Sequence, residues 1–203
     1  MLKENARIES FSDGVFAIAI TLLILEIRVP PHSTVHSVND LWHGLLKLWP
    51  SFFALLLSFG IILVSWANHH YLFGLLDKSS RPFLYANGFL LLTITIMPFS
   101  TALLAQYIGT DYAKPAIALY CFGGVVNSFG WNLLLHTLYK PILLVRSVAA
   151  AENLHTIKKS VQLGFIAYVV STILAFWFPV IALVINLLLW IVWITLSITE
   201  KPA

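Results

Sequence analysis

The residues best suited to chemistry lie at the start of the first apolar stretch. Arg7 and the triplet Phe11-Ser12-Asp13 precede a run without charge from Gly14 to Leu25. Charged side chains are costly at membrane depth and are usually retained there for a function or a polar partner. These residues could therefore hold helices together or take part in the movement of an ion or a proton.

An aliphatic stripe follows this polar cluster on the same predicted helix. At about 100° per residue, Ile18, Leu22 and Leu25 form one continuous stripe, with Thr21 beside it. Asp13 lies five residues before Ile18, about 140° away around the helix. We therefore expect the helix to present its stripe to one neighbour and its polar cluster to another.

A second polar cluster, Asn68-His69-His70, ends the second apolar stretch. Adjacent histidines on a helix point about 100° apart, whereas helical metal-binding pairs favour i, i+4 spacing, so we predict no metal site. Because Arg7 and Asp13 lie at the same depth, we expect a hydrogen-bonded network with them, although the pattern does not identify which of the three residues makes the contact. The alternative is that both histidines face the lipid headgroups.

The composition indicates an integral membrane protein. Apolar residues make up 59% of the 203 residues and charged residues only 10%, whereas soluble domains carry about a quarter charged residues. We find no nucleotide-binding loop, nucleophile elbow or carboxylate pair placed for hydrolysis. The single cysteine, Cys121, excludes an intrachain disulfide. We therefore expect no enzyme activity, no cofactor and no nucleic-acid partner.

Six stretches are long and apolar enough to cross a bilayer as helices. They are residues 10–28, 46–75, 83–106, 115–139, 160–178 and 180–198. The predicted fold is thus an all-α membrane domain of six transmembrane helices over residues 1–203. We expect a polar outer loop over Pro30–His43 and a short interfacial helix over Arg146–Ser160.

The distribution of positive charge predicts the orientation. One side of the six-span topology collects nine basic residues: Lys3, Arg7, Lys78, Arg81, Lys140, Arg146, Lys158, Lys159 and Lys201. The other side has three: Arg28, Lys47 and Lys114. Cytoplasmic loops carry the excess of Lys and Arg, so both termini are predicted to be cytoplasmic.

The first stretch also resembles a known family signature. The motif is Arg7-x-x-x-Phe11-Ser12-Asp13, followed by Ala17-Ile18, Thr21-Leu22-Leu23 and Leu25-Glu26-Ile27. It resembles the signature of the transmembrane protein 175 family of potassium channels. The resemblance implies a prokaryotic member with one six-helix unit per chain, located in the plasma or inner membrane and assembled as a homotetramer.

The resemblance also implies roles for individual residues. Modest selectivity for potassium over sodium would involve the level of Ile18 and Thr21, while Arg7, Phe11, Ser12 and Asp13 would form a structural clasp held by polar groups of neighbouring helices. No TVGYG sequence occurs in the chain, so selectivity would not come from a carbonyl filter of that kind.

Our leading hypothesis is a cation channel with a central pore lined by the first helix. One chain supplies one stripe, so a closed ring of copies is the natural way to surround a pore. Ile18 would form a hydrophobic constriction, with further rings at Leu22 and Leu25, and potassium would be the permeant ion.

Two alternatives come from other functional classes. The first is a proton- or ion-coupled secondary transporter in which Asp13 titrates together with His69 or His70. The absence of an inverted repeat in the sequence counts against it. The second is a structural membrane protein, which would tolerate a polar residue at Ile18 without any effect on conductance.

Overall fold

The structure is a computed structural model, and it describes residues 4–138 and 148–199. The long helices are α1 (Glu4–Leu22), α3 (Trp49–Leu75), α4 (Arg81–Tyr107), α5 (Ala113–Thr137), α6 (Val148–Leu174) and α7 (Pro179–Thr199). The short helices are η1 (Leu23–Glu26), η2 (His32–Thr34) and α2 (Val38–Leu46). Six helical segments of the described residues are long and apolar enough to cross a membrane. The predicted all-α, six-span fold is confirmed.

Local sequence signals explain where several helices begin. Ser80 precedes α4, and its hydroxyl accepts a hydrogen bond from the backbone N–H of Phe83, which satisfies one of the unpaired donors of the first turn. Ser37 caps α2 in the same way through the N–H of Asp40. Pro179 occupies the first position of α7, where the absence of its N–H costs nothing.

Two predicted boundaries are wrong. The predicted interfacial helix over residues 146–160 is not a separate element, because residues 148–160 run without a break into α6; residues 146 and 147 lie outside the described residues. Alanines and glutamate at 149–152 are strong helix formers, so the helix continues beyond the apolar stretch. The predicted outer loop over residues 30–43 contains η2 and the beginning of α2.

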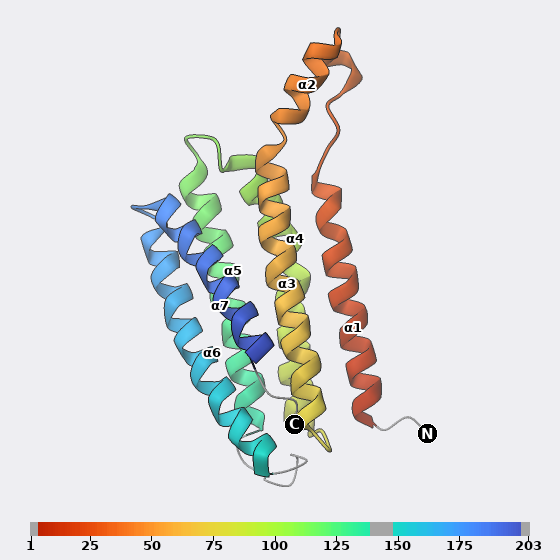
Figure 1. Ribbon diagram of the computed structural model, residues 1–203, viewed down its shortest axis with the longest axis vertical. Coiled ribbons are helices and arrows are strands. Elements are labelled where there is room, and N and C mark those ends of the chain that lie inside the picture. The colour runs from red at the N-terminus through yellow and green to blue at the C-terminus, as the bar shows by residue number, and fades with distance from the viewer. Residues whose placement is uncertain (1–3, 139–147, 200–203) are drawn as a thin grey trace.

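The helices form an elongated bundle with α1 at one edge (Figure 1). Helix α1 packs against α3 and α4, whereas α5, α6 and α7 lie on the other side of these two helices. Helix α2 projects beyond the end of the bundle. Because six long helices alternate in direction, α1 begins and α7 ends toward the same end, which we call the terminal end.

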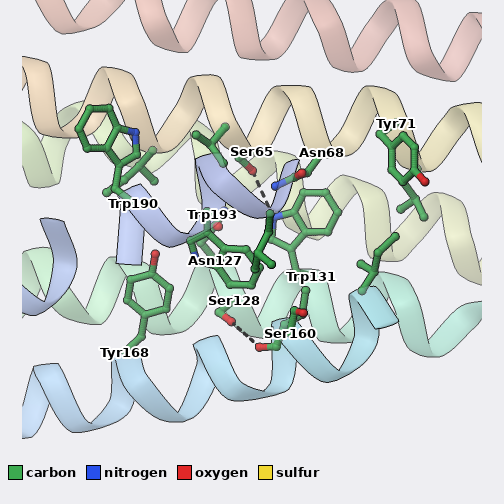
Figure 2. A pocket seen from close by; sticks show the side chains of 16 residues that line it. Ser65, Asn68, Tyr71, Asn127, Ser128, Trp131, Ser160, Tyr168, Trp190 and Trp193 are labelled. Atoms are coloured by element: carbon green, nitrogen blue, oxygen red, sulfur yellow. Dashed lines mark hydrogen bonds between the residues drawn. The ribbon is translucent and has the colours of Figure 1, made fainter. Parts of the chain in front are cut away.

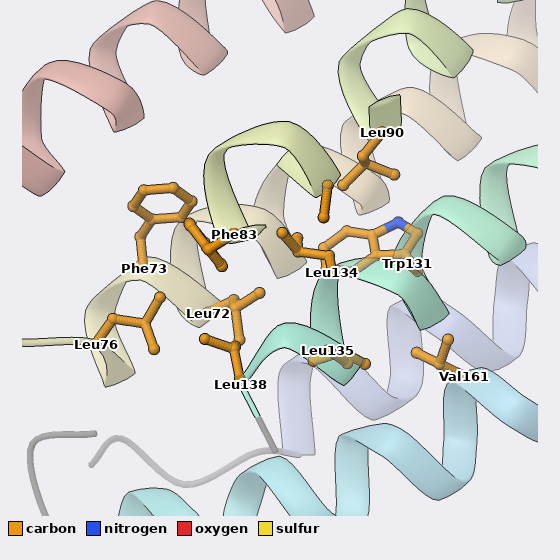
Figure 3. Packing of buried hydrophobic residues seen from close by; sticks show 11 residues of the cluster. Leu72, Phe73, Leu76, Phe83, Leu90, Trp131, Leu134, Leu135, Leu138 and Val161 are labelled. Carbon is orange, nitrogen blue, oxygen red and sulfur yellow. The ribbon is translucent and has the colours of Figure 1, made fainter. Parts of the chain in front are cut away.

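Buried residues form three clusters along the bundle. Near the terminal end, α3, α4 and α5 meet around Phe73, Phe83 and Leu134 (Figure 3), and the centroids of the two phenylalanine rings are 5.4 Å apart. A separate cluster joins Phe16 and Leu23 of the α1–η1 segment to α3 and α4. Lipid tails are as apolar as these side chains, so close packing and interhelical hydrogen bonds hold such helices together. Only one face of α1 is secured in this way.

Candidate functional site

Helix α1 and the following turn have one buried face, which is directed at α3 and α4. Ser12, Phe16, Ala19 and Leu23 recur every three or four residues, the spacing of one helix face. Each is at most 2% exposed, and the three apolar ones pack with Ile62 of α3 and with residues of α4. The identity of these residues therefore sets the rotation of α1 about its own axis.

A chain of buried hydrogen bonds connects this face to two other helices. Ser12 Oγ donates to the carbonyl of Ile8 at 2.9 Å and accepts from Asn87 Nδ2 of α4 at 3.0 Å. The carbonyl oxygen of Asn87 lies 2.8 Å from His69 Nε2 of α3. Ser12, Asn87 and His69 are all nearly or fully buried. We call Ser12, Asn87 and His69 the polar anchor.

The polar anchor assigns a hydrogen to Nε2 of His69. An amide oxygen can only accept, so His69 Nε2 carries the hydrogen and donates it to Asn87. Nδ1 is buried without a hydrogen-bond partner within the described part of the chain. The ring lies between Phe16 and Phe73, with centroid distances of 5.3 and 4.6 Å. His69 is thus a buried residue that joins α3 to α4 in an aromatic environment.

Two further polar contacts join α1 to α3 on a more accessible side. Trp66 Nε1 donates to a carboxylate oxygen of Asp13 at 2.8 Å. One turn closer to the terminal end, His70 Nδ1 lies 2.9 Å from Glu9 Oε1, and the His70 side chain is 65% exposed. The rings of Trp66 and His70 are stacked, with their centroids 6.1 Å apart. Asp13 therefore has a partner on α3, while Ser12 has its partner on α4.

Arg7 and Phe11 of the predicted clasp and Asn68 of the predicted network lie elsewhere. Arg7 is exposed and makes no ion pair or hydrogen bond with residues 4–138 or 148–199 of its own chain. Phe11 is 67% exposed. Asn68 lines a cavity between α3, α5, α6 and α7, on a different side of α3 from the contact with Asp13. Within one chain, Ser12, Asp13, His69 and His70 thus take part in the contacts between α1 and its neighbouring helices. Arg7, Phe11 and Asn68 lie outside these contacts.

Sequence analysis missed three of the participating residues. Asn87 is an amide inside the apolar α4 stretch, a type of residue that usually bonds to another helix, and this signal was available in the sequence. Trp66 and Glu9 gave no comparable signal, because tryptophan commonly faces lipid and a terminal glutamate commonly faces water. Their pairing with Asp13 and His70 depends on the register between α1 and α3.

The opposite face of α1 and η1 is open. Ile18, Leu22 and Leu25 are 61%, 40% and 67% exposed, and a side chain added at Gly14 would meet nothing within 4 Å. Thr21 shares this face, and its hydroxyl donates to the carbonyl of Ile18 at 2.9 Å. A hydroxyl that donates its single hydrogen inward keeps its oxygen lone pairs available. We call this face, with Ile18, Thr21, Leu22 and Leu25, the open stripe.

Comparison with known proteins gives concordant matches. A family model described as endosomal/lysosomal potassium channel TMEM175 matches residues 7–98. A potassium channel of Chamaesiphon minutus is 43% identical over 173 residues, which cover 85% of each chain. A potassium channel of Streptomyces collinus is 35% identical over 176 residues, covering 86% of this chain and 84% of the relative.

A solved structure matches over nearly the whole chain. It is described as a lysosomal potassium-selective channel TMEM175 homolog from Chamaesiphon minutus, with a TM-score of 0.86 and 38% identity. The match covers 96% of this chain and 98% of that one. The similarity therefore includes the arrangement of the helices as well as the motif of α1.

Proposed function

The chain belongs to the TMEM175 family, and from this we propose that it is a potassium-favouring cation channel whose pore is lined by α1 of several copies. Relatives at 43% and 35% identity are named potassium channels. The observation in this chain that carries the proposal is the open stripe on a helix whose opposite face is packed against α3 and α4. Such a helix can face a pore without losing its place in the bundle.

The polar anchor and the Asp13–Trp66 contact supply this support. They attach α1 to α4 and α3 at 2.8–3.0 Å, and the cluster around Phe16 and Leu23 adds apolar packing. Every one of these contacts lies on the side of α1 away from the open stripe. Side chains of the stripe would therefore be kept at a fixed distance from the pore axis.

The narrowest point of the proposed pore is at Ile18. A ring of isoleucine side chains offers an ion no ligand in place of its water, so it can close the path by dewetting. Thr21, one turn away, offers hydroxyl oxygens that partly replace the lost water. Because the ion meets only a few ligands there, selectivity for potassium should be modest rather than strict. This is consistent with a chain that has no TVGYG sequence.

We propose a homotetramer as the conducting form. Each chain has one open stripe, and helix α1 stands at the edge of its bundle (Figure 1), where further copies can approach it. Gly14 on the same face leaves room for a close neighbour. A closed ring with rotational symmetry buries equivalent surfaces in every subunit and leaves none unpaired.

The coupled-transporter alternative finds no support. It requires Asp13 and a histidine to exchange protons, but Asp13 accepts from Trp66 and His69 donates to Asn87. His70 is paired with Glu9 rather than Asp13. The matched relatives are named channels. The contacts of Asp13 and His69 are those of residues that join helices.

We further propose the plasma membrane of a prokaryote as the location, with both termini in the cytoplasm. The matched relatives with full-length similarity are bacterial, and the basic residues of the chain are concentrated toward the terminal end. The positive-inside rule then places that end in the cytoplasm.

A reversal-potential measurement tests the proposed function. The purified protein is incorporated into a planar bilayer with potassium on one side and sodium on the other. We expect a steady current that reverses toward the potassium equilibrium potential. A reversal near zero would replace the proposal with a non-selective pore, and a folded protein without any current would contradict the channel itself.

A further inference from the structure

Helix α2 carries its large apolar residues on one face. At about 100° per residue these side chains fall within less than half of the helix circumference. They are Val38, Leu41, Trp42, Leu45 and Leu46. All five are exposed, Val38 by 76% and Leu46 by 71%, and no residue of α2 is buried against the described part of the chain. We call these five residues the α2 face.

The segment that connects η1 to α2 lies on the polar side of α2. A Cβ added at Gly44 would lie 3.1 Å from Pro30 of this segment. Asp40 accepts a hydrogen bond from the backbone N–H of His36 at 3.1 Å. Gly44 and Asp40 share the polar side of the helix with His43. The connecting segment therefore leaves the α2 face uncovered.

The α2 face lies outside the hydrocarbon core of the membrane. Helices α2 and α3 together form an apolar helical segment of 38 residues, about 57 Å at about 1.5 Å per residue, whereas the hydrocarbon core is about 30 Å thick. The end of α3 at Phe73 is packed among other long helices, while α2 projects beyond the bundle (Figure 1). Lipid tails therefore do not cover the α2 face, and an exposed apolar surface of this kind marks a site of protein contact.

The apolar surface continues from α2 onto α3. Trp49, Phe52 and Leu56 follow Leu45 at intervals of four, three and four residues. This repeat is typical of helices that pack side by side against another helix. All three residues are exposed. The α2 face is thus the outer end of a longer apolar row that continues into the membrane.

The opposite side of α3 is occupied within the chain. The hydroxyl oxygens of Ser58 and of Tyr120 in α5 are 3.0 Å apart. Ser65 accepts a hydrogen bond from Trp131 Nε1 of α5 at 3.1 Å (Figure 2). Ser58 and Ser65 lie on the side of α3 opposite the apolar row. The contacts of α3 with α5 therefore leave this row free for a partner.

The position of α2 favours a second copy of the chain as that partner. Only residues 27–37 separate η1 from α2, so copies that gather their α1 helices around a pore also bring their α2 helices close together. Linked surfaces meet at a high effective concentration, so a small contact area adds to the association. We propose that the α2 face packs against a neighbouring copy outside the membrane and stabilises the assembly. This inference rests on the proposed assembly around α1.

Cysteine labelling tests whether a second copy covers the α2 face. Val38→Cys places a thiol on this face and His43→Cys places one on the polar side, while the native Cys121 is buried. A water-soluble maleimide is added to each variant in detergent, once in the assembled form and once after dilution to the monomer. We expect Val38→Cys to react several-fold more slowly when assembled, and His43→Cys to react equally in both forms.

Two labelling results would overturn the proposal. Slow labelling of Val38→Cys that does not change on dilution would show that detergent, and not a second copy, covers the face. Rapid labelling in both forms would show that the face is open in the assembly.

A substitution on the α2 face measures its contribution to assembly. We expect Trp42→Gln to raise the concentration at which half of the assembly dissociates by about tenfold or more, because burial of a large apolar side chain changes an association constant by at least that factor. Light scattering coupled to chromatography gives the masses, and circular dichroism checks that the helix content is kept. His43→Gln on the polar side is the control and should dissociate like the wild type.

The wild-type protein separates the two proposals. Wild-type protein that assembles, with Trp42→Gln dissociating at the same concentration, would contradict the contact at α2 alone. Wild-type protein that is monomeric at every concentration would overturn the proposed assembly around α1 and this contact with it.

Discussion

Ser12 and Asp13 are neighbours in sequence but attach α1 to different helices. Ser12 accepts from Asn87 of α4 and Asp13 from Trp66 of α3. Consecutive residues on a helix point about 100° apart, so two adjacent polar residues suit a helix that lies against two others. This arrangement gives the Ser-Asp pair a structural purpose without any proton transfer.

At Ile18, the residue proposed as the narrowest point of the pore, we expect Ile18→Asn to raise conductance several-fold and to lower selectivity. An amide wets the constriction and offers ligands to any cation, so the barrier to entry falls. Single-channel recordings with potassium and sodium measure both effects. Ile166→Asn on α6, where the native residue is also largely exposed, is the matched control and should leave currents unchanged. Unaltered currents in Ile18→Asn would remove this residue from the narrow point.

Thr21 allows a separate test of the ligand oxygen. Thr21→Val keeps the shape of the side chain but replaces the hydroxyl with a methyl group, so we expect the potassium-to-sodium permeability ratio to fall toward unity. Thr21→Ser retains the hydroxyl and should keep most of the selectivity. Reversal potentials under bi-ionic conditions give the ratios. Equal ratios for the two variants would show that the oxygen plays no part.

At the scale of the element, α1 has one buried face and one exposed face. Its buried face joins apolar packing to the polar anchor, whereas the open stripe is largely exposed. The helix tightens into η1 after Leu22. With conduction proposed at the open stripe, stability and conduction depend on opposite faces of α1. Substitutions on each face should affect one property more than the other.

The polar anchor should contribute measurably to stability. Asn87→Leu leaves Ser12 and the Nε2–H of His69 without their partner. An unpaired buried polar group costs about 1–3 kcal/mol, while membrane interhelical hydrogen bonds average about 0.6 kcal/mol. We expect the free energy of unfolding to fall by about 1 kcal/mol or more, measured by denaturation in mixed micelles. Asn132→Leu is the control, because the amide of Asn132 donates to Ser128 of its own helix. A cost no larger than that of the control would show that the anchor is dispensable.

At the scale of the whole molecule, the bundle is asymmetric. Helices α5, α6 and α7 pack together on one side, and α1 occupies the opposite edge (Figure 1). Ion conduction is thus proposed at the α1 edge. We propose that a chain organised in this way completes its pore by assembly with further copies.

Arg7 provides a test of assembly. It is exposed and has no partner among the described residues of its own chain, and we propose that its role in the clasp is a contact across subunits. We expect Arg7→Ala to shift the protein toward smaller species on dilution in detergent, measured by light scattering coupled to chromatography. Lys114→Ala, at an exposed cation toward the other end of the bundle, is the control. Identical masses for the variant and wild type at every concentration would remove Arg7 from the clasp.

The sequence alone predicted the six spans and the two-faced character of the first helix. Hydropathy over about 20 residues and the spacing of Ile18, Leu22 and Leu25 are local properties, so no knowledge of neighbouring helices was needed. The roles of the open-stripe residues remain predictions. The boundary over residues 148–160 was wrong because the propensity of the chain to remain helical outweighed its polarity there.

Only the tertiary structure decided how the polar residues pair. The sequence predicted a network for Asn68, His69 and His70 but did not distinguish among them. The structure directs His69 to Asn87, His70 to Glu9 and Asn68 to the cavity. These pairings depend on the rotation and register of α3 relative to α1 and α4. Rotation and register are set by the packing of complete helix faces, which no short stretch of sequence contains.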